Sequence, residues 1–126
     1  LPRKTPKPEK PRRMGKLWLG HMDGAILLER RPEKGLLGGM LGIPGDSWDG
    51  QGGPAPAEAH WQDIGEVRHT FTHFHLVLRV FVARLESAPN RGELVPRQAF
   101  RPSDLPTVMR KAFDLARDIL DSRDTV

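Results

Sequence analysis

Half of segment 35–56 is glycine or proline, and this segment limits the fold more than any other part of the chain. It contains eight glycines and three prolines in 22 positions. Both residue types disfavour helix strongly, so no regular helix is expected there.

Two apolar stretches ahead of that segment predict a β-hairpin. Residues 17–22 and 25–29 flank the pair Asp23 and Gly24. An Asp-Gly pair between apolar runs is a strong signal for a two-residue turn between antiparallel strands.

The strongest extended pattern in the chain lies at residues 66–85. Apolar side chains fall on both faces of this stretch, which predicts one strand buried on both sides. A turn at 90–92 and a short strand at 93–95, lying beside the long strand, are expected to follow.

One convincing helix is expected near the end of the chain. Apolar residues recur at three- and four-residue steps from Val108 to Leu120, with charged residues largely opposite. Pro106 suits a first helical turn, so the helix should start close to it. Three or four strands and one helix predict an α+β domain with a mixed or antiparallel sheet and a C-terminal helix.

Positive charge is concentrated in the first 16 residues. They hold seven lysines and arginines and one glutamate, a net +6, whereas the whole chain is +4, so the other 110 residues sum to −2. Four prolines favour an extended, polyproline-like arm. Such an arm either neutralises phosphates or acts as a solvated tether, and the pattern favours the tether.

Length and composition exclude several classes of protein. A chain of 126 residues suits a single domain, and we expect it to be a piece of a longer protein. The absence of cysteine excludes disulfides, thiolate metal sites and thiol catalysis within this chain, and it fits a cytoplasmic location. No apolar run approaches the roughly 18 residues of a membrane-spanning helix, so no membrane association is expected.

The candidate sites for metal binding and catalysis are weak. His69, His73 and His75 alternate along one stretch and could hold zinc, but the pattern favours hydrogen-bonded histidines at a strand end. The glycine-rich segment has neither common phosphate-binding glycine motif, and no serine lies in a nucleophile motif. We therefore predict no catalytic residue, no metal site and no cofactor in this chain.

Several blocks of sequence resemble a known family when taken in order. They are Arg30-Arg31-Pro32, the run 35–44, Trp48 and the run Val67-Arg68-His69-Thr70-Phe71-Thr72-His73-Phe74-His75-Leu76. Over about residues 17–120 they resemble the C-terminal domain of bacterial adenine DNA glycosylases of the MutY type. The resemblance implies a Nudix-like fold that recognises 8-oxoguanine opposite adenine. It also implies a separate N-terminal glycosylase domain, carrying an iron–sulfur cluster, that excises the adenine.

The resemblance assigns lesion recognition to Phe71, Thr72 and His73, with threonine where the family has serine. A hydroxyl can accept a hydrogen bond from the N7–H of 8-oxoguanine and donate one to its O8. Phe71 would be an apolar wedge between bases, and His73 a donor to phosphate or a base edge. Further candidate phosphate contacts are Arg12, Arg13, Lys16, Arg68 and His69.

These expectations divide the chain into a basic linker arm (1–16), a Nudix-like recognition domain (17–121) and a C-terminal tail (122–126). The helix that carries the metal-binding glutamates of Nudix hydrolases should be shortened or missing, because the segment is rich in glycine and lacks the required glutamates. The expected partner is duplex DNA containing 8-oxoguanine opposite adenine. The alternatives, in descending order, are a protein-interaction module on the same fold, a stand-alone nucleotide pyrophosphohydrolase and a zinc protein.

Overall fold

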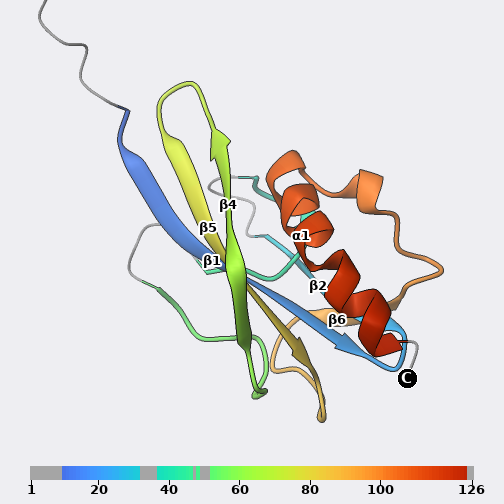
Figure 1. Cartoon of the computed structure of the whole chain (residues 1–126). Coiled ribbons are helices and arrows are strands. Elements are labelled where there is room, and N and C mark those ends of the chain that lie inside the picture. Colours follow the sequence, from blue (N-terminus) through green and yellow to red (C-terminus); the bar gives the residue numbers. More distant parts are fainter. Residues whose placement is uncertain (1–9, 32–36, 47, 49–51, 125–126) are drawn as a thin grey trace, which may run out of the picture.

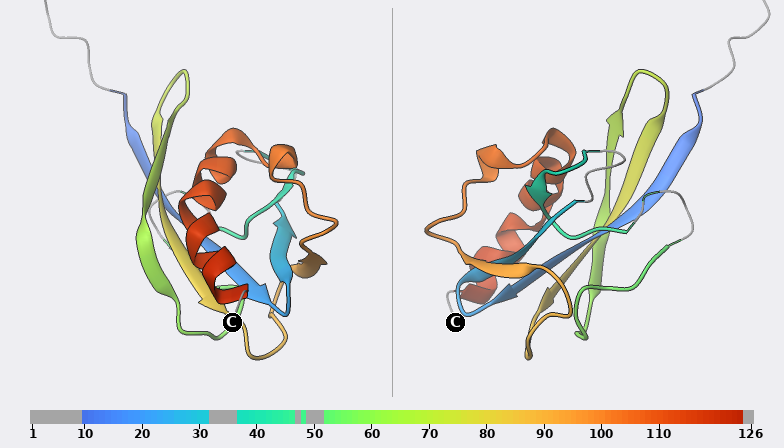
Figure 2. Two further views of the ribbon diagram at one scale, coloured as in Figure 1. Left: turned by 45° about the vertical axis from the view of Figure 1, so that its right-hand side comes forward. Right: turned by 180° about the vertical axis from the view of Figure 1, so that it is seen from behind.

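The structure is a twisted mixed sheet with one long helix packed on a face of it (Figures 1 and 2). The computed structural model describes residues 10–31, 37–46, 48 and 52–124. The strands are β1 (Arg12–Met22), β2 (Ala25–Arg30), β3 (Leu41–Gly42), β4 (Gln62–Thr70), β5 (His75–Arg84) and β6 (Glu93–Pro96). A short helix η1 (Pro102–Asp104) precedes α1 (Thr107–Asp124). The expected α+β architecture with a C-terminal helix is confirmed.

The strand order is β3-β2-β1-β5-β4, and β6 pairs with β2. Strands β1 and β5 are parallel, whereas the other pairs are antiparallel, so the sheet is mixed. The predicted short strand at 93–95 exists, but the prediction that it lies beside the long strand was wrong. Its partner is the hairpin strand β2, which lies on the side of β1 away from the long strand β5.

Strand β1 begins five residues earlier than the sequence pattern indicated. It pairs with β5 from Arg12, opposite His75, to His21, opposite Arg84. The expectation that residues 12–16 belong to an unpaired arm was therefore wrong. The last proline of the arm is Pro11, and strand pairing uses backbone groups that are available whatever charge the side chains carry. The rest of the arm, residues 1–9, lies outside the described residues.

The stretch 66–85 forms two strands rather than one. Strands β4 and β5 are antiparallel and are joined by a loop of four residues, Phe71–Phe74. Burial on both faces is confirmed for β5, because Leu76 and Leu78 are inaccessible and Val77, between them, is only 6% exposed. The pattern changes at the break, since β4 is largely exposed whereas β5 is buried on both faces.

The turn at Asp23 and Gly24 is confirmed. Both residues have positive φ angles, 48° and 77°, as a two-residue turn matched to strand twist requires. The register that pairs Met22 with Ala25 leaves these two residues alone in the loop.

Helix α1 starts at Thr107, directly after Pro106, as predicted. It continues to Asp124. The sequence had suggested a C-terminal tail from residue 122, and this was wrong for residues 122–124, which are helical. The described residues between 37 and 61 contain no helix, as expected for the glycine-rich segment. Neither helix in the described part of the chain has the uninterrupted apolar length that crossing a lipid bilayer requires.

Apolar side chains are buried on both faces of the sheet. The larger cluster joins β1 and β5 to α1 and includes Leu17, Leu78 and Phe113, and a smaller cluster around Leu27 lies on the opposite face. Trp48 is fully buried in the larger cluster and lies against Gly15 of β1. A Cβ at position 15 would overlap the Trp48 ring and would lie 2.8 Å from Leu78 Cδ2.

We predict that Gly15→Ala destabilises the chain by about 1–3 kcal/mol, because Trp48 and Leu78 must move to admit a methyl group. Denaturant unfolding measures the effect. Met14→Ala is the matched control on the same strand, since Met14 is 50% exposed, and it should change the free energy of unfolding by less than about 0.5 kcal/mol. Equal stability of Gly15→Ala and the parent would mean that Trp48 does not pack there.

Candidate nucleic-acid interface

The loop between β4 and β5 and the start of β1 lie at the same end of the sheet (Figure 1). The loop is closed by the Phe71 N–H, which donates to the Phe74 carbonyl at 2.8 Å. Beneath it, Thr70 Oγ1 and His75 Nδ1 form a hydrogen bond of 2.9 Å. Because Arg12 lies opposite His75, the cationic start of β1 is brought next to the loop.

The loop has a packed base and an exposed tip. The Phe71 ring stacks on Phe74, with centroids 4.8 Å apart and planes 20° apart. It also meets His69 edge to face, at a centroid distance of 4.8 Å. Both phenylalanines are half-buried against the main core, whereas Thr72 and His73 are exposed. The tip therefore presents a hydroxyl and an imidazole to solvent.

The candidate phosphate contacts on β1 divide between the two faces of the sheet. Arg12 and Lys16 are both exposed, and their even spacing puts them on one face. Arg13 lies on the other face, where its Nε donates to the Trp48 carbonyl at 2.9 Å and its guanidinium carbon lies 5.2 Å from the Phe74 centroid. Arg12 is available to a ligand at this end, whereas Arg13 supports the loop. Lys16 lies four residues further along β1, with its ammonium 5.9 Å from the Phe81 ring centroid.

On β4, the two candidates already have partners within the protein. Arg68 donates to Glu66 at 2.8 Å in an exposed ion pair. His69 Nδ1 lies 3.5 Å from the Lys111 ammonium of α1, which also donates to the Arg68 carbonyl at 2.9 Å. Partial burial lowers the pKa of His69 below its usual 6.5, and the positive charge of Lys111 lowers it further. Both effects favour the neutral form of His69.

Lys111 escaped the sequence analysis because it lies on the charged side of the helix pattern. Nothing local marks it as part of the loop's surroundings, and its role depends on how α1 packs on β4. The zinc hypothesis gains no support, since His69 and His75 each take part in hydrogen bonds. Within the described ranges, no three histidine or acidic side chains are grouped as a metal site requires.

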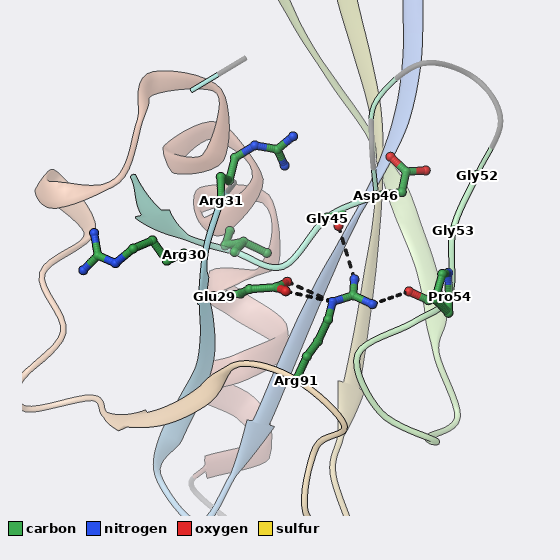
Figure 3. Close-up of a pocket in the computed structure, with 10 residues that line it drawn as sticks. Glu29, Arg30, Arg31, Gly45, Asp46, Gly52, Gly53, Pro54 and Arg91 are labelled. Atoms are coloured by element: carbon green, nitrogen blue, oxygen red, sulfur yellow. Dashed lines mark hydrogen bonds and ion pairs between the residues drawn. The ribbon is translucent and has the colours of Figure 1, made fainter. Parts of the chain in front are cut away.

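A cavity that the sequence analysis also missed lies near the end of β2 (Figure 3). It has a volume of about 350 Å³. Arg91 crosses it: its Nε lies 2.9 Å and 3.0 Å from the two carboxylate oxygens of Glu29, and its other nitrogens donate to the carbonyls of Pro54 and Gly45 at 2.8 Å and 3.2 Å. Arg91 thus ties together three segments that are distant in sequence.

The other charged groups of this cavity also stabilise the fold. Asp46 is buried, and its Oδ1 accepts hydrogen bonds from the backbone N–H groups of Trp48 at 2.9 Å and Lys16 at 3.2 Å. The Arg31 guanidinium carbon lies 3.6 Å from the Trp48 ring centroid, and desolvation lowers the pKa of Arg31 despite the opposing effect of Asp46. The two carboxylates among the lining residues, Glu29 and Asp46, are both engaged in internal contacts.

Known proteins resemble this chain in both sequence and structure. The human adenine DNA glycosylase is 30% identical over an alignment of 115 positions, which covers 75% of this chain and 21% of that protein. The chain therefore spans about a fifth of the length of this relative.

Two solved structures share the fold. The C-terminal domain of mouse MUTYH, solved in complex with human PCNA, has a TM-score of 0.63 and 24% identity, with 86% of this chain and 89% of that one covered. A MutT protein from Methanosarcina mazei Go1 has a TM-score of 0.63 and 20% identity, with 90% and 99% covered. The family model described as the NUDIX domain matches residues 17–115. With its mixed sheet and C-terminal helix, the chain belongs to the NUDIX domain family.

Proposed function

We propose that this chain is the lesion-recognition module of an adenine DNA glycosylase, and that it reads 8-oxoguanine opposite adenine in duplex DNA. The observation that carries the proposal is the exposed tip of Thr72 and His73 on a packed loop, next to the exposed cation Arg12, with Lys16 further along the same face of β1. The likeness to the human adenine DNA glycosylase and to the mouse MUTYH domain supports it. We also propose that this glycosylase is bacterial and acts in the cytoplasm.

Thr72 is the residue that distinguishes the oxidised base. Oxidation at C8 converts N7 of guanine from an acceptor into an N–H donor and adds an acceptor oxygen. One hydroxyl can meet both changes, because it accepts and donates. The branched side chain of threonine has few rotamers, so the direction of its oxygen depends on how the backbone of the loop is held.

The roles of the neighbouring residues follow from their exposure and packing. Arg12 and Lys16 neutralise phosphates, and His73 at the tip donates to a phosphate or a base edge. Phe71 is the apolar wedge that enters between bases, and its stacking on Phe74 holds the ring for this role.

Excision of adenine belongs to a separate glycosylase domain, which we propose as the second partner of this chain. The chain has no cysteine with which to bind an iron–sulfur cluster, so the cluster is assigned to that other domain. This chain supplies recognition, and the remainder of the protein supplies catalysis.

Replacing Thr72 by valine keeps the branched shape and removes the hydroxyl. We predict that Thr72→Val weakens binding to 8-oxoguanine:adenine duplex by about 1–3 kcal/mol, because the polar edge of the lesion loses its partner. Binding to the matched guanine:adenine duplex should hardly change. Anisotropy titrations at low salt measure both affinities, with Thr72→Ser as the control that keeps the hydroxyl. Equal losses on both duplexes, in a protein that melts like the parent, would contradict this role.

A nucleotide pyrophosphohydrolase is the alternative that the family allows, and the cavity near Arg91 is where it would be sought. We predict no Mg²⁺-dependent hydrolysis of nucleoside triphosphates or diphosphate-linked nucleotides. Glu29 is paired with Arg91 and Asp46 holds two backbone N–H groups, so neither carboxylate is available for an ion. Phosphate release tests this, with an active NUDIX hydrolase as positive control. Turnover abolished by EDTA and by Glu29→Gln would favour the enzyme over the recognition module.

A further inference from the structure

Five side chains from four segments form one continuous column at the base of the β4–β5 loop. In order they are Lys111, His69, Phe71, Phe74 and Arg13. We call this set the ring column. Its three rings make successive contacts at centroid distances of 4.8 Å, and a cation lies at each end. The column thus links α1, β4 and β1 to the β4–β5 loop.

Each terminal cation is fixed by a backbone carbonyl. Lys111 Nζ donates to the Arg68 carbonyl at 2.9 Å, and Arg13 Nε donates to the Trp48 carbonyl at 2.9 Å. Lys111 is thereby held beside His69, whose Nδ1 lies 3.5 Å from the ammonium. Arg13 is held over the Phe74 face, where a guanidinium is attracted by the ring.

The loop needs such support because its backbone provides little. The hydrogen bonds described within or onto it are that from Phe71 N–H to the Phe74 carbonyl, at 2.8 Å, and that from Lys10 Nζ to the Phe71 carbonyl, at 3.3 Å. Thr72 and its neighbour at the tip are exposed, so no core packing fixes them. The direction of the Thr72 hydroxyl therefore depends on how firmly the rings beneath it are stacked.

We propose that Lys111 and Arg13 are positioning residues for lesion recognition. They hold the two ends of the ring column and so aim the Thr72 hydroxyl, although neither touches the damaged base. The inference rests on the proposed function and extends it: specificity for the lesion depends on a helix residue and a strand residue outside the loop.

The test compares Lys111→Met with Arg84→Gln in this chain. Methionine keeps roughly the length of the side chain and removes both its positive charge and its hydrogen bond to the Arg68 carbonyl. Arg84 is exposed at the other end of β5, so its variant removes one positive charge far from the loop. Lys111→Met should reduce the preference for 8-oxoguanine:adenine over guanine:adenine duplex by about 3- to 10-fold, the equivalent of one aromatic contact. Arg84→Gln should leave the preference unchanged, and Lys111→Arg should largely restore it.

Salt dependence separates positioning from direct DNA contact. A side chain that neutralises a phosphate contributes about one unit to the slope of log affinity against log salt. Lys111→Met should therefore keep the slope of the parent. A slope lower by about one would make Lys111 a phosphate contact and overturn the positioning role.

Nuclear magnetic resonance reports on the column without DNA. In Lys111→Met the pKa of His69 should rise toward 6.5, because the neighbouring positive charge is lost, and the ring signals of Phe71 and Phe74 should shift. Arg13→Lys, which keeps the charge, should disturb the same ring signals. In the double variant, the loss of preference should be smaller than the sum of the losses in Arg13→Lys and Lys111→Met, since both residues act through one column.

The outcomes distinguish the inference from the function beneath it. A parent chain that shows no preference for damaged duplex would overturn the proposed function itself. A parent that prefers the lesion, with Lys111→Met showing altered ring signals but an undiminished preference, would overturn the positioning role alone.

Discussion

The parallel pairing of β1 with β5 is the interaction on which the rest of this structure depends. Ten consecutive residue pairs join the two strands, and they form the centre of the sheet that α1 covers. The pairing buries Leu17 and Leu19 and places Gly15 under Trp48. It also carries Arg12 and Arg13 to the end where the β4–β5 loop emerges. Core and candidate interface are therefore built by the same set of backbone hydrogen bonds.

The sequence predicted correctly those elements that depend only on residues close together in the chain. The Asp23–Gly24 turn and the amphipathic helix after Pro106 were both found, because each depends on residues close in sequence. The start of β1 was missed, since the strand partner of Arg12 lies more than sixty positions away and a basic, proline-containing stretch is typical of a linker. The partner of β6 was predicted wrongly for the same reason. Its partner β2 lies far away in the sequence, and the pairing of strands is decided by the whole sheet.

The candidate site follows the same division. The run from Val67 to Leu76 could be identified from the sequence, and its resemblance to a family supplied roles for Phe71, Thr72 and His73. The packing of Phe71 within a ring column, and the support from Lys111, arise from contacts between elements and leave no local signal. Arg91 and Glu29 likewise meet across 62 positions, so neither could be predicted to line a cavity.

The most direct test of lesion reading is a pair of amide chemical-shift titrations of the isotope-labelled chain. The two duplexes should differ only in having 8-oxoguanine or guanine opposite adenine. If the Thr72 hydroxyl reads the oxidised edge, the difference between the titrations will be concentrated at residues 71–75, while shifts near Arg12 and Lys16 will be common to both. A difference centred on the cavity around Arg91, or no difference between the duplexes, would contradict this account.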